Sequence, residues 1–370
     1  MKVTAAGGID SESIEQFRLA LSSGQNIPDI LQLNYSSIAE FAEAGVLADI
    51  GEYVQPYLDD VTEAGKTLMK YGDTFVAFPY EVKTKLWFYR TDLFADAGID
   101  VAQVKTQEDF VAAGKKLQAA HPESYIWNIG PNTEFYNLAM IVSGNGAQFS
   151  TKEPCEIVVG SDPGTKQAFQ ALYDLSREDS VNTTIDDWTP EWQSALADGT
   201  IASTLLASWF PTFLQEYAPD LSGKWAVTTW PVIGGAEGGS ESAGSLFVIP
   251  QASKNKEAAA KFLSGTLLDP KGSQAYVEAR GGSYLPAVTS VLNSEFMKNN
   301  DYFGTSLSEA FLASGDQFKI FPYDPNAMKE QAVLRDQLVT YLAGSDPDPT
   351  QFLQTAQAEL AAQVGCPFQD

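Results

Sequence analysis

Histidine and cysteine are scarce in this chain, which has one histidine, His121, and two cysteines, Cys155 and Cys366, among 370 residues. A structural zinc site needs about four such ligands, and a cysteine nucleophile needs a histidine as its base. The composition therefore argues against both kinds of site. His121 follows an amphipathic segment and is expected to be a solvated cap residue. The two cysteines, 211 residues apart, are compatible with one disulfide in an oxidising compartment or with two buried thiols.

Long apolar runs are also missing. No window reaches the 18 or so consecutive apolar residues that a membrane-spanning helix needs, so the sequence predicts a soluble chain. Basic residues are outnumbered by acidic ones, 23 to 48, and the net charge of −25 opposes binding to nucleic acid or to an anionic membrane. The motifs G-x-S-x-G, H-E-x-x-H and the P-loop are absent. An enzyme is therefore disfavoured, and no cofactor or metal is implied.

What is present suits a large α/β protein. The length exceeds what one hydrophobic core usually fills, and 44% apolar and 12% aromatic residues supply two cores. Residues 2–5 read as a strand, a helix follows, "IPDILQLNY" reads as a short buried strand, and a second helix covers 37–44. This order is typical of a parallel sheet with helical crossovers. Tyr35 follows the second strand, where ligands of such sheets bind, and the Gly/Ser stretch 234–245 is the best linker candidate.

The stretch "FPYEVKTKLWFYR", residues 78–90, reads as a strand that carries Glu81, Lys83 and Lys85 among aromatic and β-branched residues. Trp87, Phe88 and Tyr89 should alternate between core faces. Lys85 is expected to point to solvent. A purely structural explanation for Glu81 and Lys83 is a surface salt bridge on an edge strand.

Four segments, in order, resemble one family. They are "NIPDILQLNYSSIAEFAEAGVLADI", "FPYEVKTKLWFYRTDLFADAGID", "WQSALADGTIASTLLASWFPTFL" and "EAAAKFLSGTLLDPKGSQAYVEARGGSYLPA". Together they resemble the maltose-binding-protein-like extracellular solute-binding proteins, family 1, which feed sugars to bacterial ABC importers. Each motif is weak alone, but the ordered set covers almost the whole chain.

The resemblance implies an α/β, two-lobe periplasmic-binding-protein-like (type II) fold with a hinge and mixed, mostly parallel sheets flanked by helices. It places 1–82 and 246–290 in lobe 1, and 83–245 and 291–370 in lobe 2. The first crossover then falls near 81–85 and the return near 242–246. In the family a further strand and helix precede the segment matched by "KVTAAG". We therefore expect the natural protein to begin upstream, with a signal peptide and a lipid-anchored cysteine.

The resemblance also implies which residues line the site. Sugar sites combine flat aromatic platforms with a few fixed polar groups. Trp209 matches the stacking tryptophan of the family, although a lone tryptophan is more often a core residue. Trp192 is expected to pack in the core, and Trp230 could do either. The full set of candidate ligand-binding residues is Tyr35, Glu81, Lys83, Tyr136, Asn137, Trp209, Trp230, Gly244, Ser245, Arg280 and Gly282.

Within this set the role of each polar position stays open. Tyr136 and Asn137 open a helix of the second lobe, where the family often places a contact. Gly244 and Ser245 match a turn at which backbone amides approach the ligand, since glycine permits close approach. Arg280 either forks onto sugar hydroxyls or pairs with an acid.

The expected function is capture of an oligosaccharide outside the cytoplasm and its delivery to ABC permease subunits, through closure of the lobes over the ligand. The protein is expected to be a monomer, periplasmic or on the cell surface as a lipoprotein, with no nucleic-acid partner. The alternatives are a binding protein of the same fold for a peptide, a polyamine, a metal or another non-sugar solute, and a glycoside-active enzyme.

Overall fold

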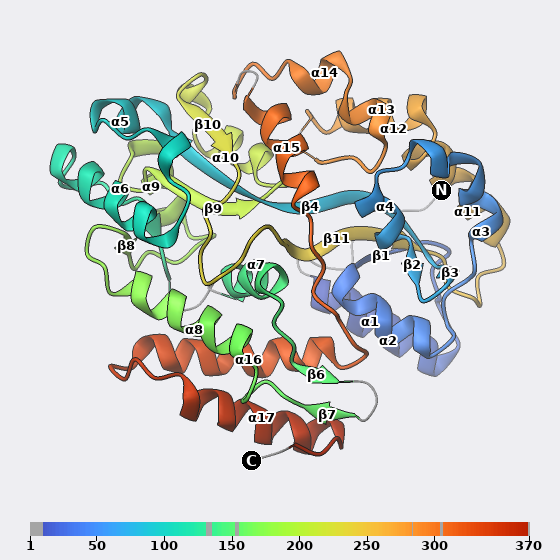
Figure 1. Ribbon diagram of the computed structural model, residues 1–370. Coiled ribbons are helices and arrows are strands. Elements are labelled where there is room, and N and C mark those ends of the chain that lie inside the picture. Colours follow the sequence, from blue (N-terminus) through green and yellow to red (C-terminus); the bar gives the residue numbers. More distant parts are fainter. Residues whose placement is uncertain (1–9, 131–134, 152–154, 283, 304–305, 369–370) are drawn as a thin grey trace. The chain divides into compact units, whose positions relative to one another are not determined.

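Helices alternate with short strands along the computed structural model (Figure 1), which describes residues 10–130, 135–151, 155–282, 284–303 and 306–368. The strand expected at 2–5 lies outside the described residues. The strands are β1 (Leu31–Asn34), β2 (Lys70–Tyr71), β3 (Thr74–Phe75), β4 (Ala77–Arg90), β5 (Trp127–Asn128), β6 (Ser150–Thr151), β7 (Glu156–Ile157), β8 (Asn182–Thr183), β9 (Ser203–Ala207), β10 (Trp225–Thr228) and β11 (Ser240–Val248).

Helices make up most of the regular structure. They are α1 (Asp10–Ser23), α2 (Ile38–Glu43), α3 (Gly51–Val54), α4 (Glu63–Leu68), α5 (Thr91–Asp96), α6 (Gln107–Ala120), α7 (Phe135–Asn145), α8 (Pro163–Ser176), α9 (Pro190–Asp198), α10 (Pro211–Tyr217), α11 (Lys256–Leu267), α12 (Pro270–Ala279), α13 (Thr289–Leu292), α14 (Glu295–Lys298), α15 (Ser306–Asp316), α16 (Ala327–Ala343) and α17 (Thr350–Val364).

The chain packs as two compact units. Unit 1 comprises Met1–Val82, Ser242–Ser294 and Tyr323–Pro325; unit 2 comprises Lys83–Glu241, Glu295–Pro322 and Asn326–Asp370. The units change at 82/83, 241/242 and 294/295, and 323–325 also belongs to unit 1. The lobe boundaries expected from the sequence are 82/83, 245/246 and 290/291, with all of 291–370 in lobe 2, and they stay predictions. The chain thus leaves unit 1 within β4 and re-enters it within β11.

The main sheet has the strand order β1-β11-β4-β10, and β9 also pairs with β4. The pairs β1–β11, β4–β10 and β4–β9 are antiparallel. The parallel pair β5–β8 belongs to a separate two-stranded sheet. The α/β class is therefore confirmed, but the expectation of mostly parallel sheets is wrong for the described pairs. The alternation of helices and strands in the sequence predicted the class, yet it could not show that β4 runs opposite to β9 and β10.

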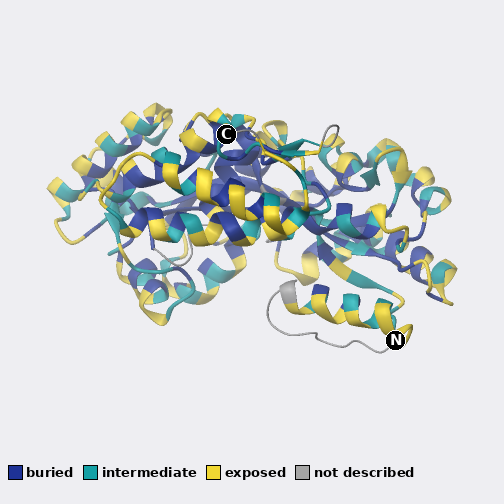
Figure 2. Ribbon diagram, turned by 90° about the horizontal axis from the view of Figure 1, so that it is seen from below, coloured by how far each residue is buried: buried dark blue, intermediate teal, exposed yellow. Residues whose placement is uncertain are grey.

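Longer helices bury one side, and Figure 2 shows buried and exposed positions alternating along the same helical ribbons. In α8, for example, Ala168, Phe169, Leu172 and Leu175 are buried at helical spacing. In unit 2, α16 and α17 lie side by side next to the short strands β6 and β7 (Figure 1). Amphipathic helices covering short strands account for a core made largely of side chains from distant parts of the sequence.

A disulfide ties the end of the described chain to β7. Cys155 and Cys366 are bonded, with their Cα atoms 5.5 Å apart. The Ile157 amide donates to the Pro367 carbonyl at 3.0 Å, and the Gly160 amide donates to Oε1 of Gln357 at 2.8 Å. Of the two possibilities that the sequence left open for the cysteines, the structure has the bridge.

The glycine-rich stretch at 234–245 is not a loose linker, because its second half forms β11 and its first half is pinned to unit 2. The Gly239 amide donates to the Gln317 carbonyl at 3.0 Å. The Ser240 amide donates to Oγ of Ser143 at 2.8 Å. A Cβ atom added to Gly238, whose φ is +74°, would lie 2.1 Å from the Gln317 oxygen. Glycine here permits close backbone packing. The stretch does contain a boundary between the two units, at 241/242, but these contacts hold it in place.

Candidate functional site

Strand β4 carries the charged stretch from the sequence, and its side chains alternate as predicted. Trp87 and Tyr89 both pack against Phe94, with ring centroids 5.7 and 5.2 Å away. Phe88 instead contacts Phe210 on the opposite face, at 5.3 Å. Residues 83, 85, 87 and 89 therefore share one face of the strand. Trp87 is fully buried and belongs to the core.

Lys85 does not point to solvent, and that prediction is wrong. Its side chain is 3% exposed, on the same face as Trp87, and its Nζ lies 4.9 Å from the centroid of the Trp230 ring. Burial, with a smaller contribution from the Lys319 ammonium, lowers the pKa of Lys85 to about 7. The strand alternation already implied this burial, because positions two apart in a strand face the same way.

Trp209 lies two residues beyond β9, whose five residues are all buried. It is half-buried and faces the ring of Trp188 at a centroid distance of 5.3 Å and an interplanar angle of 33°. The Phe213 ring stands nearly perpendicular to both indoles, at 5.6 Å from Trp188 and 5.8 Å from Trp209. Unit 2 therefore presents two offset, half-buried indoles with a third ring across them, which we call the indole pair.

The backbone holds Trp188 in an unusual conformation. Its φ is +67°, a left-handed value that costs a bulky residue about 1–3 kcal/mol. The next residue, Thr189, caps α9 by accepting from the Trp192 amide at 3.1 Å, and Trp192 is fully buried, as predicted. Nothing in the sequence predicts a left-handed tryptophan, so Trp188 was missed as a platform residue.

Beside the indole pair lies a buried carboxyl group. Asp187 is 5% exposed, and its Oδ1 accepts from Nδ2 of Asn128 at 2.6 Å. Burial raises the pKa of Asp187 to about 7, although the Asn128 bond acts in the opposite direction. Oδ1 of Asn128 in turn accepts from Nε1 of Trp192 at 3.3 Å. These bonds fix the loop that carries Trp188.

Trp230 is a core residue more than a surface platform. It is 8% exposed, its Nε1 donates to the Leu86 carbonyl at 2.7 Å, and its ring meets Trp127 edge-on at 6.2 Å. Tyr136 and Asn137 both lie in α7, where Tyr136 is 40% exposed and Asn137 is buried. Of this helical pair, only Tyr136 is exposed.

In unit 1, Tyr35 is half-buried in a 3-10 turn (Tyr35–Ser37) directly after β1. The Tyr323 ring lies 6.5 Å away, a contact that the sequence could not reveal because the two residues are far apart in the chain. Ser245 stands opposite Asn34 in the β1–β11 ladder and donates from Oγ to Oδ1 of Asn34 at 3.2 Å. Gly244 and Ser245 thus lie within β11 and not in the turn that the sequence suggested, and Ser245 pairs with the residue just before Tyr35.

Gly244 is in close contact with protein, not with open space. An added Cβ atom would lie 2.7 Å from both the Glu81 carbonyl oxygen and Cδ1 of Leu68. Close approach at this glycine was predicted, but its observed partner is β4. The side chains of Glu81 and Lys83 are 2% and 9% exposed, so neither lies on an exposed edge.

Arg280 and Gly282 lie where α12 ends. The Arg280 guanidinium stacks over the Tyr284 ring at 4.6 Å and donates to its hydroxyl. Its expected contact with sugar hydroxyls stays a prediction. Gly281 and Gly282 have φ values of +67° and +72°, which glycine adopts without strain. Tyr284 and Tyr276 both lie 6.3 Å from the Tyr80 ring, forming a tyrosine group beside Arg280.

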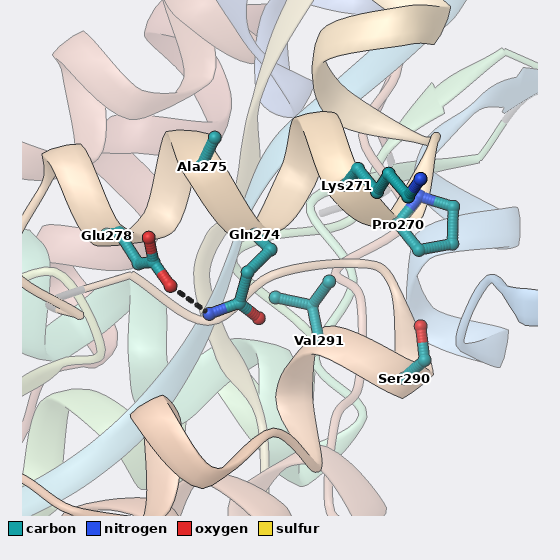
Figure 3. Close-up of a pocket in the computed structure, with 7 residues that line it drawn as sticks. All are labelled: Pro270, Lys271, Gln274, Ala275, Glu278, Ser290 and Val291. Atoms are coloured by element: carbon teal, nitrogen blue, oxygen red, sulfur yellow. Dashed lines mark hydrogen bonds between the residues drawn. The ribbon is translucent and has the colours of Figure 1, made fainter.

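A groove of about 390 Å³ lies elsewhere on unit 1, between α12 and α13 (Figure 3). It is lined by Pro270, Lys271, Gln274, Ala275, Glu278, Ser290 and Val291. Gln274 donates to Glu278 at 2.8 Å along the helix. None of the predicted site residues lines this groove.

Neither metal binding nor membrane crossing has support in the described ranges. They contain no group of three or more histidine, cysteine, aspartate or glutamate side chains arranged to hold a metal ion. Within the same ranges no helix is both long enough and apolar enough to span a bilayer.

Several proteins of known name are similar to this chain in sequence and in fold. The arabinooligosaccharide-binding protein of Bacillus subtilis is 25% identical over 360 residues, covering 94% of this chain and 81% of the relative. The binding protein of a B. animalis subsp. lactis ABC transporter, solved with β-1,6-galactobiose, is 24% identical with a TM-score of 0.80, covering 98% of this chain and 92% of its own.

A second solved structure extends the likeness to the whole chain. The galacto-N-biose/lacto-N-biose I-binding protein of Bifidobacterium longum, solved with lacto-N-biose, has a TM-score of 0.81 at 21% identity, covering 100% of this chain and 90% of its own. Such solute-binding proteins of ABC transporters share the two-lobe α/β fold expected from the sequence. The family model described as bacterial extracellular solute-binding protein matches residues 2–269, and the chain belongs to that family.

Proposed function

We propose that this protein binds an oligosaccharide outside the cytoplasm and delivers it to the permease subunits of an ABC importer. The observation that carries the proposal is the indole pair, Trp188 and Trp209, at the end of a buried strand. Sugar rings present apolar C–H faces, which stack on flat aromatic rings. The names of the relatives support the same ligand class, since they bind arabino-oligosaccharides, β-1,6-galactobiose and lacto-N-biose.

The remaining candidate residues come from both units and supply further contacts or support under this proposal. Tyr35, Glu81, Gly244, Ser245, Arg280 and Gly282 come from unit 1, and Lys83, Tyr136, Asn137 and Trp230 from unit 2. Binding, not bond cleavage, is the proposed activity. We further propose that the ligand shifts the population of the protein toward a closed form, with the segments of β4 and β11 near the unit boundaries as the hinge.

An oxidising location follows from the same proposal. The Cys155–Cys366 bridge is of the kind that persists outside the cytoplasm. A monomer anchored by a lipid or free in a periplasm would both satisfy this requirement. Mass spectrometry of the natural protein from its membrane fraction distinguishes the two, because a lipid anchor adds a fixed mass.

Calorimetric titration against a panel of di- to tetrasaccharides tests the ligand class. We expect at least one neutral or acidic oligosaccharide to bind, and Trp209→Ala to weaken that binding by about 0.5–1.5 kcal/mol or more, because a stacking face is lost. The control is Phe296→Ala, an exposed aromatic residue of unit 2 that lies on α14, away from β9 in the sequence. Binding of a peptide or polyamine with no sugar response would overturn the proposal.

A further inference from the structure

The ammonium group of Lys85 is buried without a hydrogen-bond partner among the residues that the structure describes. The residue is 3% exposed, and its Nζ is covered. A buried charge normally has an opposite charge or several hydrogen bonds, because removing an ion from water is costly. A methionine would fill a similar space without that cost. The described part of unit 2 therefore gives the Lys85 ammonium neither a hydrogen-bond acceptor nor a negative charge.

The neighbours of Lys85 are those of a cation site. Its Nζ lies 4.9 Å from the Trp230 ring centroid, within the range of a cation–π contact. The indole N–H of Trp230 is already bonded to the Leu86 carbonyl, so the ring offers only its π face. This contact compensates the ammonium in part, but it supplies no negative charge.

A second ammonium acts on the same group. Lys319 is close enough to make protonation of Lys85 less favourable, and burial acts in the same direction on the pKa. Lys319 is itself exposed, and its Nζ donates to the Gly144 carbonyl at 3.2 Å. No ion pair of either lysine with an acidic side chain is seen among the described residues, and like charges repel each other. An anion placed between the two ammonium groups would reverse the sign of that interaction.

We propose that Lys85, Lys319 and Trp230 form a subsite for the carboxylate of an acidic sugar, so that the preferred ligand is an oligosaccharide containing a uronic acid. The inference rests on the proposed function, whose ligand class it narrows. A carboxylate has two oxygens, and each can accept a charge-assisted bond from one ammonium. Trp230, which is buried, holds the Lys85 ammonium from behind through its ring.

The subsite adjoins the residues already proposed to bind ligand. Lys83 lies two positions before Lys85 on the same face of β4, and Trp230 was itself a candidate. Lys319 is the accessible member of the pair, whereas the Lys85 ammonium must turn outward to meet an anion. Its four-carbon side chain allows this turn. The net charge of −25 opposes an acidic ligand, but physiological salt screens charges beyond about 8 Å.

The test compares ligands matched in length and linkage that differ only in the carboxylate. Digalacturonate and trigalacturonate are titrated beside α-1,4-galactobiose and α-1,4-galactotriose, and an aldotetraouronic acid beside xylotetraose, at fixed salt and pH 6.5. We expect an acidic member to bind about tenfold tighter than its neutral partner, the size of a charge-assisted hydrogen bond. Equal or weaker binding of every acidic member overturns the inference while leaving sugar binding intact. Failure of every sugar, neutral and acidic, overturns the proposed function itself.

Variants then locate the preference. Lys85→Met should reduce the acidic-to-neutral affinity ratio about tenfold, and Lys319→Gln should reduce it in the same direction. Lys116→Met, which removes an exposed lysine of α6, should leave the ratio unchanged. Lys319 is exposed, so its variant keeps the test decisive if Lys85→Met does not fold, which circular dichroism reveals. A ratio unchanged in Lys319→Gln and in folded Lys85→Met would assign the acid preference to another site and overturn the inference.

Discussion

Unit 2 contains a buried ammonium group, Lys85, and a strained residue, Trp188. The pKa of Lys85 is near 10.5 in an unfolded chain and about 7 in the folded protein. Between these pH values the unfolded state binds more protons, so stability rises with pH across this window and is lost as pH falls through about 7. The folded protein thus bears the full cost of the buried cation only in acid.

We therefore expect Lys85→Met to be more stable than the parent protein at pH 6, with the difference shrinking toward pH 10. Urea unfolding of both proteins at pH 6, 7, 8, 9 and 10, followed by tryptophan fluorescence, measures the difference. Lys116→Met should run parallel to the parent at every pH. A Lys85→Met curve that also runs parallel would contradict the assigned burial of the ammonium.

Trp188 stores strain in its backbone. We expect Trp188→Gly to be more stable than Trp188→Ala by about 1 kcal/mol, because both lose the ring but only glycine adopts a φ of +67° without strain. Both should weaken sugar binding, since both remove half of the indole pair. Thermal unfolding ranks the two variants, and alanine being equal to or better than glycine would refute the left-handed conformation.

The stability contributed by Asp187 depends on pH in the opposite direction to that of Lys85. The pKa of Asp187 is raised from 3.8 to about 7, so stability is fully present below pH 4 and falls as pH rises through 7. Asp187→Asn should remove this loss while keeping the bond to Asn128 through an amide flip. The free energy of unfolding of both proteins is measured at pH 5 and at pH 8. On going from pH 5 to pH 8 the parent should lose stability relative to the variant. The same difference at both pH values would show that Asp187 titrates normally.

At the scale of elements, the glycine-rich approach to β11 is a packed contact. Gly238→Ala should destabilise unit 2 by about 2 kcal/mol or more, since the new methyl would overlap the Gln317 carbonyl and the φ of +74° disfavours alanine. Gly315→Ala is the matched control, because an added Cβ there meets nothing within 4 Å and lies in α15, where alanine is favoured. Unfolding by urea measures both. Tolerance of alanine at 238 would contradict the tight packing of this segment against Gln317.

Elements were predicted better from the sequence than their pairing. The strand that carries Trp87, Phe88 and Tyr89, the short strand in "IPDILQLNY" and the helix over 37–44 follow from local periodicity, and the structure has them as β4, β1 and α2. Strand direction in the sheet depends on contacts far apart in the chain, so the parallel expectation failed. The tight packing of the glycines at 238 and 239 was not predicted for the same reason, because composition alone does not show which backbone lies opposite them.

Candidate residues divide in the same way. Trp209 was found because a motif precedes it, whereas Trp188 and Tyr323 become visible only through contacts with Trp209 and Tyr35. Lys85 was misplaced because its charge was weighed above the strand alternation. Local patterns thus located half of the aromatic surface, and long-range packing supplied the rest.

For the molecule as a whole, the disulfide is the strongest covalent constraint on unit 2. Reduction, or the double change Cys155→Ser and Cys366→Ser, should lower stability by about 5 kcal/mol from loop entropy, since the bridge joins residues 211 positions apart. Calorimetry with and without reductant measures the loss. The transition that belongs to unit 1 should not move. A shift of both transitions, or of neither, would contradict the assignment of the bridge to unit 2 alone.

The order in which the chain is synthesised limits how this fold can form. Strand β1 at residues 31–34 pairs with residues 245–248, so the sheet edge of unit 1 stays open until more than two hundred further residues have emerged. Unit 2 waits equally for Cys366 to meet Cys155. Neither unit can complete its core from the part of the chain that is made first. The protein therefore cannot fold one domain at a time during translation. Its half-made chains must be kept from aggregating until both strands of the β1–β11 ladder are available.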